Sequence, residues 1–118
     1  MREIKFRAWF EKFKEMYTVK MIDLQREIAY FDKYNYRSFY DINLMEYTGL
    51  KDKNNKEIYE GDIVIHHSKM YKIIFNAEEA RFVLRDDEFE LEIPFTNNNS
   101  KRMEIVGNIY ETPELLGE

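Results

Sequence analysis

Two adjacent histidines are the side chains in this sequence best suited to metal binding or acid–base chemistry. They are His66 and His67, and the chain has no other histidine and no cysteine. Neighbouring residues of a strand point to opposite faces, so the two rings would not ligate one ion without distortion. We therefore predict no catalytic residue and no metal site, with one of the two histidines packed inward as a neutral ring.

A short polar segment has part of the spacing of a calcium-binding loop. It runs Asp52-Lys53-Asn54-Asn55-Lys56-Glu57. A calcium loop needs a glycine at its sixth position and a bidentate glutamate at its twelfth, where this chain has Glu57 and Ile63. The sequence therefore predicts neither calcium nor another cofactor. Since the serines and threonines show no nucleophile motif, we expect that the protein is not an enzyme.

Five acidic side chains lie close together in the second half of the sequence: Asp86, Asp87, Glu88, Glu90 and Glu92. In an extended strand the last three share one face, while Phe89, Leu91 and Ile93 share the other. This pattern predicts a solvated outer face. A site for a cation or a basic partner is the alternative interpretation.

Aromatic residues are dense between residues 30 and 47, a segment without glycine or proline. Tyrosine combines a large ring with a hydroxyl that tolerates water, so tyrosine-rich surfaces are common at protein interfaces. We expect self-association into a homo-oligomer, or binding of another protein. The candidate interface residues are Tyr30, Phe31, Tyr34, Tyr36, Phe39 and Tyr40.

A nucleic-acid-binding protein is the alternative function. Bases could stack on Tyr17, Tyr34, Tyr36 and Tyr40. The candidate phosphate contacts are Arg2, Lys5, Arg7, Lys12, Lys14 and Lys20. The charge distribution disfavours this function. Residues 1–59 carry 12 Lys/Arg against 10 Asp/Glu (+2), and residues 60–118 carry 6 against 13 (−7), which sums to −5. Only the first half could supply a basic face.

Length and composition fit one folded domain. The chain has 118 residues, of which 44% are apolar and 16% aromatic, a composition that favours strands over helices. The sequence shows no signal-peptide pattern and no apolar run of membrane-spanning length. The absence of cysteine fits a reducing compartment. We expect a soluble protein of the cytoplasm that does not enter a membrane.

Residues 2–9 alternate apolar and charged side chains, which predicts a half-buried strand. Residues 10–31 are ambiguous, because their apolar residues recur at spacings of three and four, as in an amphipathic helix. Residues Tyr17–Met21 also alternate as in a strand. A reversal through Glu11–Glu15 would pair them antiparallel with the first strand.

Short strands separated by polar breaks are predicted for the second half, which indicates a meander or a small barrel. They cover Asp62–His67, Met70–Phe75, Arg81–Arg85, Glu88–Phe95 and Met103–Ile109. A further strand is expected at Asn43–Tyr47, after an irregular segment from Tyr30. We also expect a loop at Asn97–Ser100 and a helical turn where Pro113 follows the capping residue Thr112.

Two chain reversals are predicted between Tyr47 and Val64. Gly49 and Gly61 accept positive φ without a Cβ clash, and Asn54 and Asn55 are among the few other residues that enter the left-handed region. The information in this segment concerns backbone turns and no reactive group.

Three blocks of sequence form a pattern that spans the chain. The first is Ile4-Lys5-Phe6-Arg7-Ala8-Trp9. The second runs from Tyr47-Thr48-Gly49-Leu50-Lys51-Asp52-Lys53 to Glu60-Gly61-Asp62-Ile63-Val64. The third joins Val106-Gly107-Asn108-Ile109-Tyr110-Glu111 with Pro113-Glu114-Leu115-Leu116. Together these blocks resemble the YopX family of bacteriophage and prophage proteins. Two positions depart from the family pattern: Phe10 stands where Asp is usual, and Asn55 where Gly is usual.

The resemblance implies one mainly β domain over residues 1–118, with a small antiparallel SH3-like barrel. It favours an N-terminal hairpin over the helix for residues 10–23, and a short helical turn at the C-terminus. It implies a phage or prophage accessory protein in a bacterial cytoplasm, with no established activity and no catalytic residue to transfer. The residues it marks as fold-determining are Trp9, Tyr47, Gly49, Asn54, Asn55, Gly61, Asp62, Gly107 and Asn108.

Overall fold

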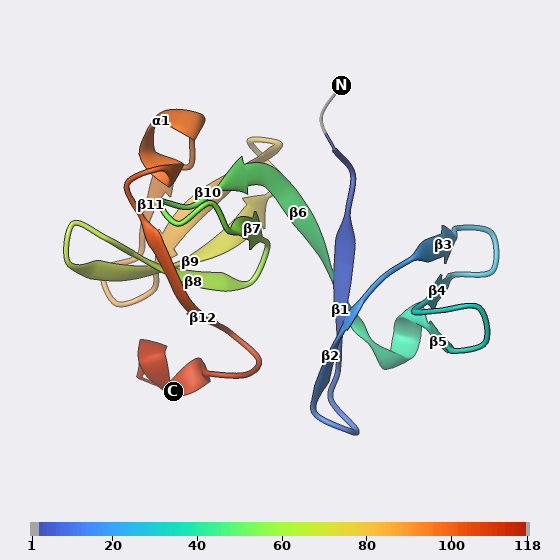
Figure 1. Cartoon of the computed structure of the whole chain (residues 1–118). Helices are drawn as coiled ribbons and strands as arrows, with labels where there is room; N and C mark the ends of the chain where they lie inside the picture. The colour runs from blue at the N-terminus through green and yellow to red at the C-terminus, as the bar shows by residue number, and fades with distance from the viewer. Residues whose placement is uncertain (1–2, 118) are drawn as a thin grey trace. The chain divides into compact units, whose positions relative to one another are not determined.

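A computed structural model describes residues 3–117 and shows a mainly β chain (Figure 1). Its contacts divide the chain into two compact units, residues 1–47 and residues 48–118. The strand pairings described in both units are antiparallel, as predicted. The assignment of residues 1–118 to a single domain stays a prediction, and so does the SH3-like form of the barrel.

The first unit begins with the predicted hairpin. Strand β1 (Phe6–Phe10) pairs with β2 (Glu15–Thr18), and the register joins Ala8 to Tyr17. The turn between them closes where the Lys14 N–H donates to the Glu11 carbonyl at 3.2 Å. The helical alternative for residues 10–31 is wrong. The apolar side chains with this spacing do not form one face, because Phe10, Tyr17 and Phe31 pack in the core of the first unit, while others such as Met21 and Leu24 are exposed.

Three short strands follow in the first unit: β3 (Met21–Asp23), β4 (Ile28–Tyr30) and β5 (Tyr36–Ser38). They form one sheet in the order β3-β4-β5. The irregular segment predicted from Tyr30 is therefore wrong in part. The turn after Tyr30 was not predicted because it contains no glycine or proline. Asp32 closes it instead, since its Oδ1 accepts the N–H groups of Tyr34 and Asn35 at 2.8 and 2.9 Å.

The 3₁₀ helix η1 (Phe39–Asp41) leads into β6 (Asn43–Lys51). Residues Asn43–Glu46 of β6 pair with Trp9–Phe6 of β1. The core of the first unit is built on buried residues from β1, from β4 and from the segment between η1 and β6. Half-buried aromatic rings pack against them. The buried residues are Ala8, Phe10, Ala29 and Ile42.

The second unit contains the predicted meander. Its five-stranded sheet has the order β11-β10-β9-β8-β12. The strands are β8 (Asp62–His66), β9 (Lys69–Asn76), β10 (Arg81–Asp86), β11 (Leu91–Pro94) and β12 (Glu104–Asn108). Strand β11 begins three residues later than predicted, because the chain turns through Glu88–Glu90 and Glu90 has a φ of 53°.

The core of the second unit lies on this sheet and on β7 (Glu57–Tyr59), which neighbours the end of β6 in the strand order. Its buried residues come from β7, β8, β9 and β10 and from the segment before β12. They are Ile58, Val64, Tyr71, Ile73, Leu84 and Met103.

Two short helices complete the second unit. The helical turn predicted at the C-terminus is the 3₁₀ helix η2 (Pro113–Leu116). The loop predicted at Asn97–Ser100 is wrong, because these residues form the one-turn helix α1. Thr96 and Asn99 form a capping box around it, in which each side chain accepts the other's backbone N–H, at 2.9 and 3.3 Å. Among residues 3–117 no helix has the length and apolar character needed to cross a bilayer.

Candidate functional site

The predicted interface aromatics divide into exposed and packed residues. Tyr34, Tyr36 and Tyr40 are 78%, 52% and 86% exposed, and we call these three residues the aromatic surface. Phe31 and Phe39 instead pack against the core of the first unit. Tyr30 is half-buried, and its ring lies 5.5 Å from the ring of Tyr36. The sequence did not separate the exposed aromatic residues of this segment from the packed ones, and the interface itself stays a prediction.

Local polar bonds position the aromatic surface. Tyr34 lies on the turn closed by Asp32, whose carboxylate also accepts the Asn35 side-chain amide at 2.6 Å. This bond, together with the backbone N–H groups of Tyr34 and Asn35, lowers the pKa of Asp32 and keeps it ionised. Tyr40 lies in η1, whose first turn is capped by the Ser38 hydroxyl at 3.2 Å from the Tyr40 nitrogen.

A cavity of about 460 Å³ lies beside β2, and we call it the β2 cavity. Its size falls within the range of ordinary ligand pockets. The rings of Tyr17 and Phe31 stack beside it, with centroids 4.4 Å apart and planes 8° from parallel. The Tyr17 hydroxyl donates to Glu15 at 2.6 Å, and this bond is the main reason why the pKa of Tyr17 is raised. The lining residues are Met16, Tyr17, Thr18, Lys20, Phe31, Asp32, Asn35 and Arg37.

Two cations of the β2 cavity have no carboxylate partner. Among residues 3–117, neither Lys20 nor Arg37 lies within ion-pair distance of an acidic side chain. The guanidinium of Arg37 lies over the ring of Phe10 at 4.8 Å, and one of its N–H groups donates to the Tyr36 carbonyl. Asp32 is the acidic residue of the lining, and its oxygens accept the bonds described above. Arg37 was not predicted as a site residue, because it lines the same cavity as Lys20 only in the folded chain.

The predicted nucleic-acid contacts do not all remain free cations. Lys5 lies 3.4 Å from Glu3, and Lys14 lies 2.8 Å from Glu11. Lys12 is exposed on the β1–β2 turn with its amine over the ring of Phe13, while Arg7 is half-buried in β1. Arg2 lies outside the described residues. Lys20 borders the β2 cavity, and it also borders a smaller cavity of about 220 Å³ together with Lys5.

Of the residues marked as fold-determining in the middle of the chain, Gly61 and Asn55 lie at turns, whereas Gly49 lies within β6. Gly49, Gly61 and Asn55 have positive φ angles of 88°, 90° and 65°. Asn54 differs, since it contributes a side-chain bond to Glu104 at 3.3 Å. Asp62 is buried, and its carboxylate accepts the backbone N–H of Tyr59 at 2.8 Å, which closes the β7–β8 turn.

The remaining fold-determining residues are packed. Trp9 and Tyr47 are 3% and 5% exposed, and the Trp9 indole donates to Glu11. Gly107 leaves space that the Thr112 hydroxyl occupies, because a Cβ built on Gly107 would lie 2.0 Å from that oxygen. The Asn108 side chain accepts the N–H groups of Tyr110 and Glu111 at 3.0 and 2.8 Å. The role of the fold-determining residues in stability stays a prediction.

The segment that partly matches a calcium loop is a turn closed by Asp52. This carboxylate is 4% exposed. Its Oδ1 accepts the N–H groups of Asn54 and Lys56, each at 2.9 Å, and its Oδ2 accepts the N–H of Ile105 at 3.0 Å. The sequence showed the turn but not the bond to β12. Among residues 3–117 no three histidine or acidic side chains are placed to hold a metal ion.

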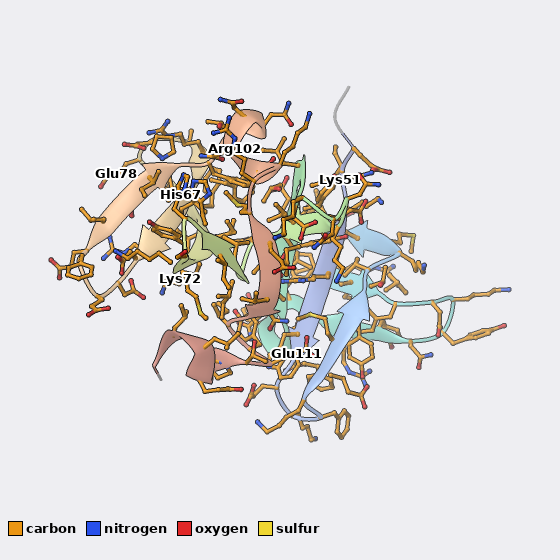
Figure 2. All side chains as sticks on the ribbon, turned by 60° about the vertical axis from the view of Figure 1, so that its left-hand side comes forward. Lys51, His67, Lys72, Glu78, Arg102 and Glu111 are labelled. Carbon is orange, nitrogen blue, oxygen red and sulfur yellow. The ribbon has the colours of Figure 1, made fainter. Side chains whose placement is uncertain are left out.

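The two histidines occupy different environments. His66 is the one that packs inward: it is 7% exposed, and burial, followed by the charges of His67 and Arg102, lowers its pKa. His67 lies exposed on the β8–β9 turn with a φ of 52° and is labelled on the second unit in Figure 2. Their ring centroids are 4.1 Å apart.

In the acidic cluster, Glu88, Glu90 and Glu92 are exposed, as the predicted solvated face requires, whereas Asp86 and Asp87 form ion pairs that were not predicted. Asp86 is 6% exposed and lies 2.5 Å from the Lys69 amine, which is the main reason why its pKa is lowered. Asp87 lies 2.7 Å from Lys72, which is labelled in Figure 2, and 2.9 Å from Arg85. These ion pairs form because antiparallel pairing places basic residues of β9 beside the acids at the end of β10.

Comparisons with known proteins give one family and one similar solved structure. A family model described as YopX protein matches residues 5–117. Among solved structures, the chain is similar to the crystal structure of protein EF1440 from Enterococcus faecalis, with 29% sequence identity and a TM-score of 0.78. That similarity covers 98% of this chain and 99% of that chain. No curated protein matched the sequence. Because the family model covers nearly the whole sequence, this chain belongs to the YopX protein family.

Proposed function

We propose that this chain is a non-enzymatic protein-binding module that self-associates through the aromatic surface. One observation carries the proposal. Among residues 3–117, ten large apolar side chains are exposed, and seven of them belong to the 47 residues of the first unit. Such a concentration of exposed apolar side chains is typical of interaction sites. The seven are Ile4, Phe13, Met21, Leu24, Tyr34, Tyr36 and Tyr40.

The chemistry of the aromatic surface supports a protein partner. Tyrosine buries a large area at low conformational cost, and its hydroxyl still bonds to water when the surface is free. Tyr34 and Tyr40 contribute little to the core of the first unit, since most of each side chain is exposed. A phage or prophage setting, with a phage or host protein as the alternative partner, rests on the family resemblance alone. No cofactor is part of this proposal.

The double variant Tyr34→Ser/Tyr40→Ser tests self-association. We expect the wild-type chain to form a discrete oligomer in size-exclusion chromatography with light scattering. The variant should dissociate at concentrations about tenfold higher than the wild type or more, because each lost aromatic contact weakens the interface. Circular dichroism should show an unchanged fold, since neither side chain is buried.

The matched control is Phe89→Ser, which removes a 60% exposed aromatic ring from the second unit. This variant should keep the wild-type oligomer. A wild-type chain that remains monomeric at high concentration would refute self-association. Equal dissociation of the control and the double variant would show that the aromatic surface is not the interface.

A nucleic-acid-binding function is the second candidate, supported by the unpaired cations Lys20 and Arg37. Competition between an oligothymidine and a labelled acidic peptide for the β2 cavity tests it.

A further inference from the structure

Strand β2 has an open edge. It ends the strand order β2-β1-β6-β7, so only β1 pairs with it among the described residues. The Val19 N–H donates to the Phe6 carbonyl at 3.1 Å, which makes these two residues a hydrogen-bonded pair. Bonded and non-bonded pairs alternate along an antiparallel ladder. The register therefore turns the backbone N–H and C=O groups of Met16 and Thr18 away from β1.

The β2 cavity lies along this open edge. Its lining includes Met16, Tyr17 and Thr18, and hence three of the four residues of β2. The same lining contains the two unpaired cations Lys20 and Arg37. An exposed edge offers main-chain hydrogen bonds to an added strand, and a neighbouring pocket can select one of its side chains.

We infer that the open edge of β2 binds an extended acidic segment of a partner protein. The segment adds to β2 as a strand, its backbone bonds to the free groups of Met16 and Thr18, and one carboxylate lies near Lys20 and Arg37. The two cations supply charge complementarity, which the paired cations of Lys5 and Lys14 do not.

A peptide fits this site better than a nucleic acid does. The free backbone groups of Met16 and Thr18 match the regular spacing of a peptide backbone. The faces of Tyr17 and Phe31 that meet at 4.4 Å are already stacked on each other and are closed to a base.

A second copy of β2 is a poorer occupant than an acidic segment. The antiparallel register that uses all outward groups of both strands pairs Met16 of one copy with Thr18 of the other. That register places Lys14 opposite Lys20, and like charges in such positions are destabilising. An acidic segment would meet Lys20 with the opposite charge.

This second site shares no residue with the aromatic surface, so each proposal can fail alone. The probe is a fluorescein-labelled peptide of eight residues that alternates threonine and glutamate. Its binding to the full chain is measured by fluorescence polarisation at low salt. We expect saturable binding, and binding about tenfold weaker or more for a matched peptide with lysine in place of glutamate.

Backbone pairing is tested separately from charge. A third peptide has the glutamate sequence with N-methyl groups on its four central residues, which removes their hydrogen-bond donors on both edges. We expect it to bind about tenfold more weakly. The variant Thr18→Pro removes the outward N–H on the protein side and should have the same effect. Proline is tolerated where the strand N–H faces solvent, and the N-methylated peptide covers the case of misfolding.

Charge is tested with Lys20→Glu/Arg37→Gln, which should weaken binding of the glutamate peptide about tenfold. Lys33→Glu is the control for Lys20→Glu, because it reverses one charge at an exposed lysine outside the β2 cavity, and it should bind as the wild type does. Arg37 also packs on Phe10, so Lys20→Glu alone provides a second reading, with a loss of about threefold.

Four outcomes would overturn the inference. They are equal binding of the lysine and glutamate peptides, full binding of the N-methylated peptide, an unchanged affinity in Lys20→Glu, and displacement of the peptide by an oligothymidine at lower concentration than by unlabelled peptide. The last result would favour the nucleic-acid function instead. Tyr34→Ser/Tyr40→Ser should bind the peptide normally, which separates this site from self-association.

Discussion

Asp52 stabilises the second unit through three backbone hydrogen bonds made by one buried carboxylate. In Asp52→Ala the N–H groups of Asn54, Lys56 and Ile105 lose their acceptor. We expect the free energy of unfolding to fall by about 3 kcal/mol, because unsatisfied buried donors retain their full desolvation cost. Urea unfolding followed by circular dichroism measures the loss.

The matched control is Asp32→Ala, which removes a similar turn bond from an exposed site in the first unit. Its loss of stability should be clearly smaller. An equal loss in the two variants would mean that burial and the bond to β12 add nothing to the role of Asp52.

Asp52 also makes the stability of the fold depend on pH in the acid range. Burial raises the pKa of Asp52, but the hydrogen bonds from Ile105, Lys56 and Asn54 outweigh it, so the folded pKa lies below 3.8. The stabilisation by Asp52 is therefore fully present above the unfolded pKa and is lost as pH falls through the folded pKa. Below about pH 4, wild-type stability should decline more steeply than that of Asp52→Ala.

At the level of residues, the sequence predicted backbone conformation better than it predicted which side chains lie close together. Gly49, Gly61 and Asn55 adopt positive φ because their local chemistry permits it, and local chemistry can be read from a sequence. Lys20 and Arg37 line the same cavity because of how β2 and β5 are placed. Nothing in their spacing indicates it.

At the level of elements, two glycines should respond differently to the same added methyl group. In Gly107→Ala the new Cβ would meet the Thr112 hydroxyl, which bonds to the N–H and C=O of Asn108 at 3.0 and 3.1 Å. We expect a loss of about 3 kcal/mol from this overpacking. In Gly49→Ala nothing lies within 4 Å, so the cost of about 1 kcal/mol comes from the positive φ alone.

Urea midpoints of the two variants provide the measurement. Adding Thr112→Gly should reduce the further cost of Gly107→Ala, since the nearest obstacle is then removed and only Leu115 Cδ1, at 2.9 Å, remains closer than 3.0 Å. Independent, additive effects in that double variant would contradict the steric explanation.

Strand pairs were easier to predict than the short helices. The hairpin β1–β2 and the meander β8–β11 follow from alternation between turns. Helix α1 escaped prediction because its capping box uses Asn99 at the position where glutamate or glutamine is usual. Strand β5 was missed because Asp32 closes its turn without glycine or proline.

At the level of the whole molecule, the two units should differ in resistance to opening. Among residues 3–117, the largest fully buried side chains all belong to the second unit: Ile58, Ile63, Ile73, Leu84, Met103, Val64, Val83 and Ser100. In the first unit the apolar residues with no exposed surface are Ala8 and Ala29, while its larger buried side chains keep 2–8% of their surface exposed. They are Trp9, Phe10, Ile42, Met45 and Tyr47. We expect amide hydrogens of β8–β10 to exchange at least about tenfold more slowly than those of β3–β5.

Hydrogen exchange followed by mass spectrometry or NMR provides the test, at a concentration where the chain is monomeric so that association does not protect the first unit. Equal protection of the two sets of strands would show that the chain opens as one cooperative body. Composition suggested a single core of ordinary size, and it did not reveal that the large aliphatic residues are concentrated after residue 57.

The boundary between the two units falls inside β6, between Tyr47 and Thr48. Domain boundaries usually lie in exposed linkers, where proteases cut and truncations are tolerated. Here both flanking residues are buried, and the Thr48 hydroxyl donates to the Ile58 carbonyl at 2.7 Å. Limited proteolysis therefore has no linker to cleave at this point. Fragments designed for separate expression would have to keep β6 whole, and the piece without it would begin or end on an incomplete sheet.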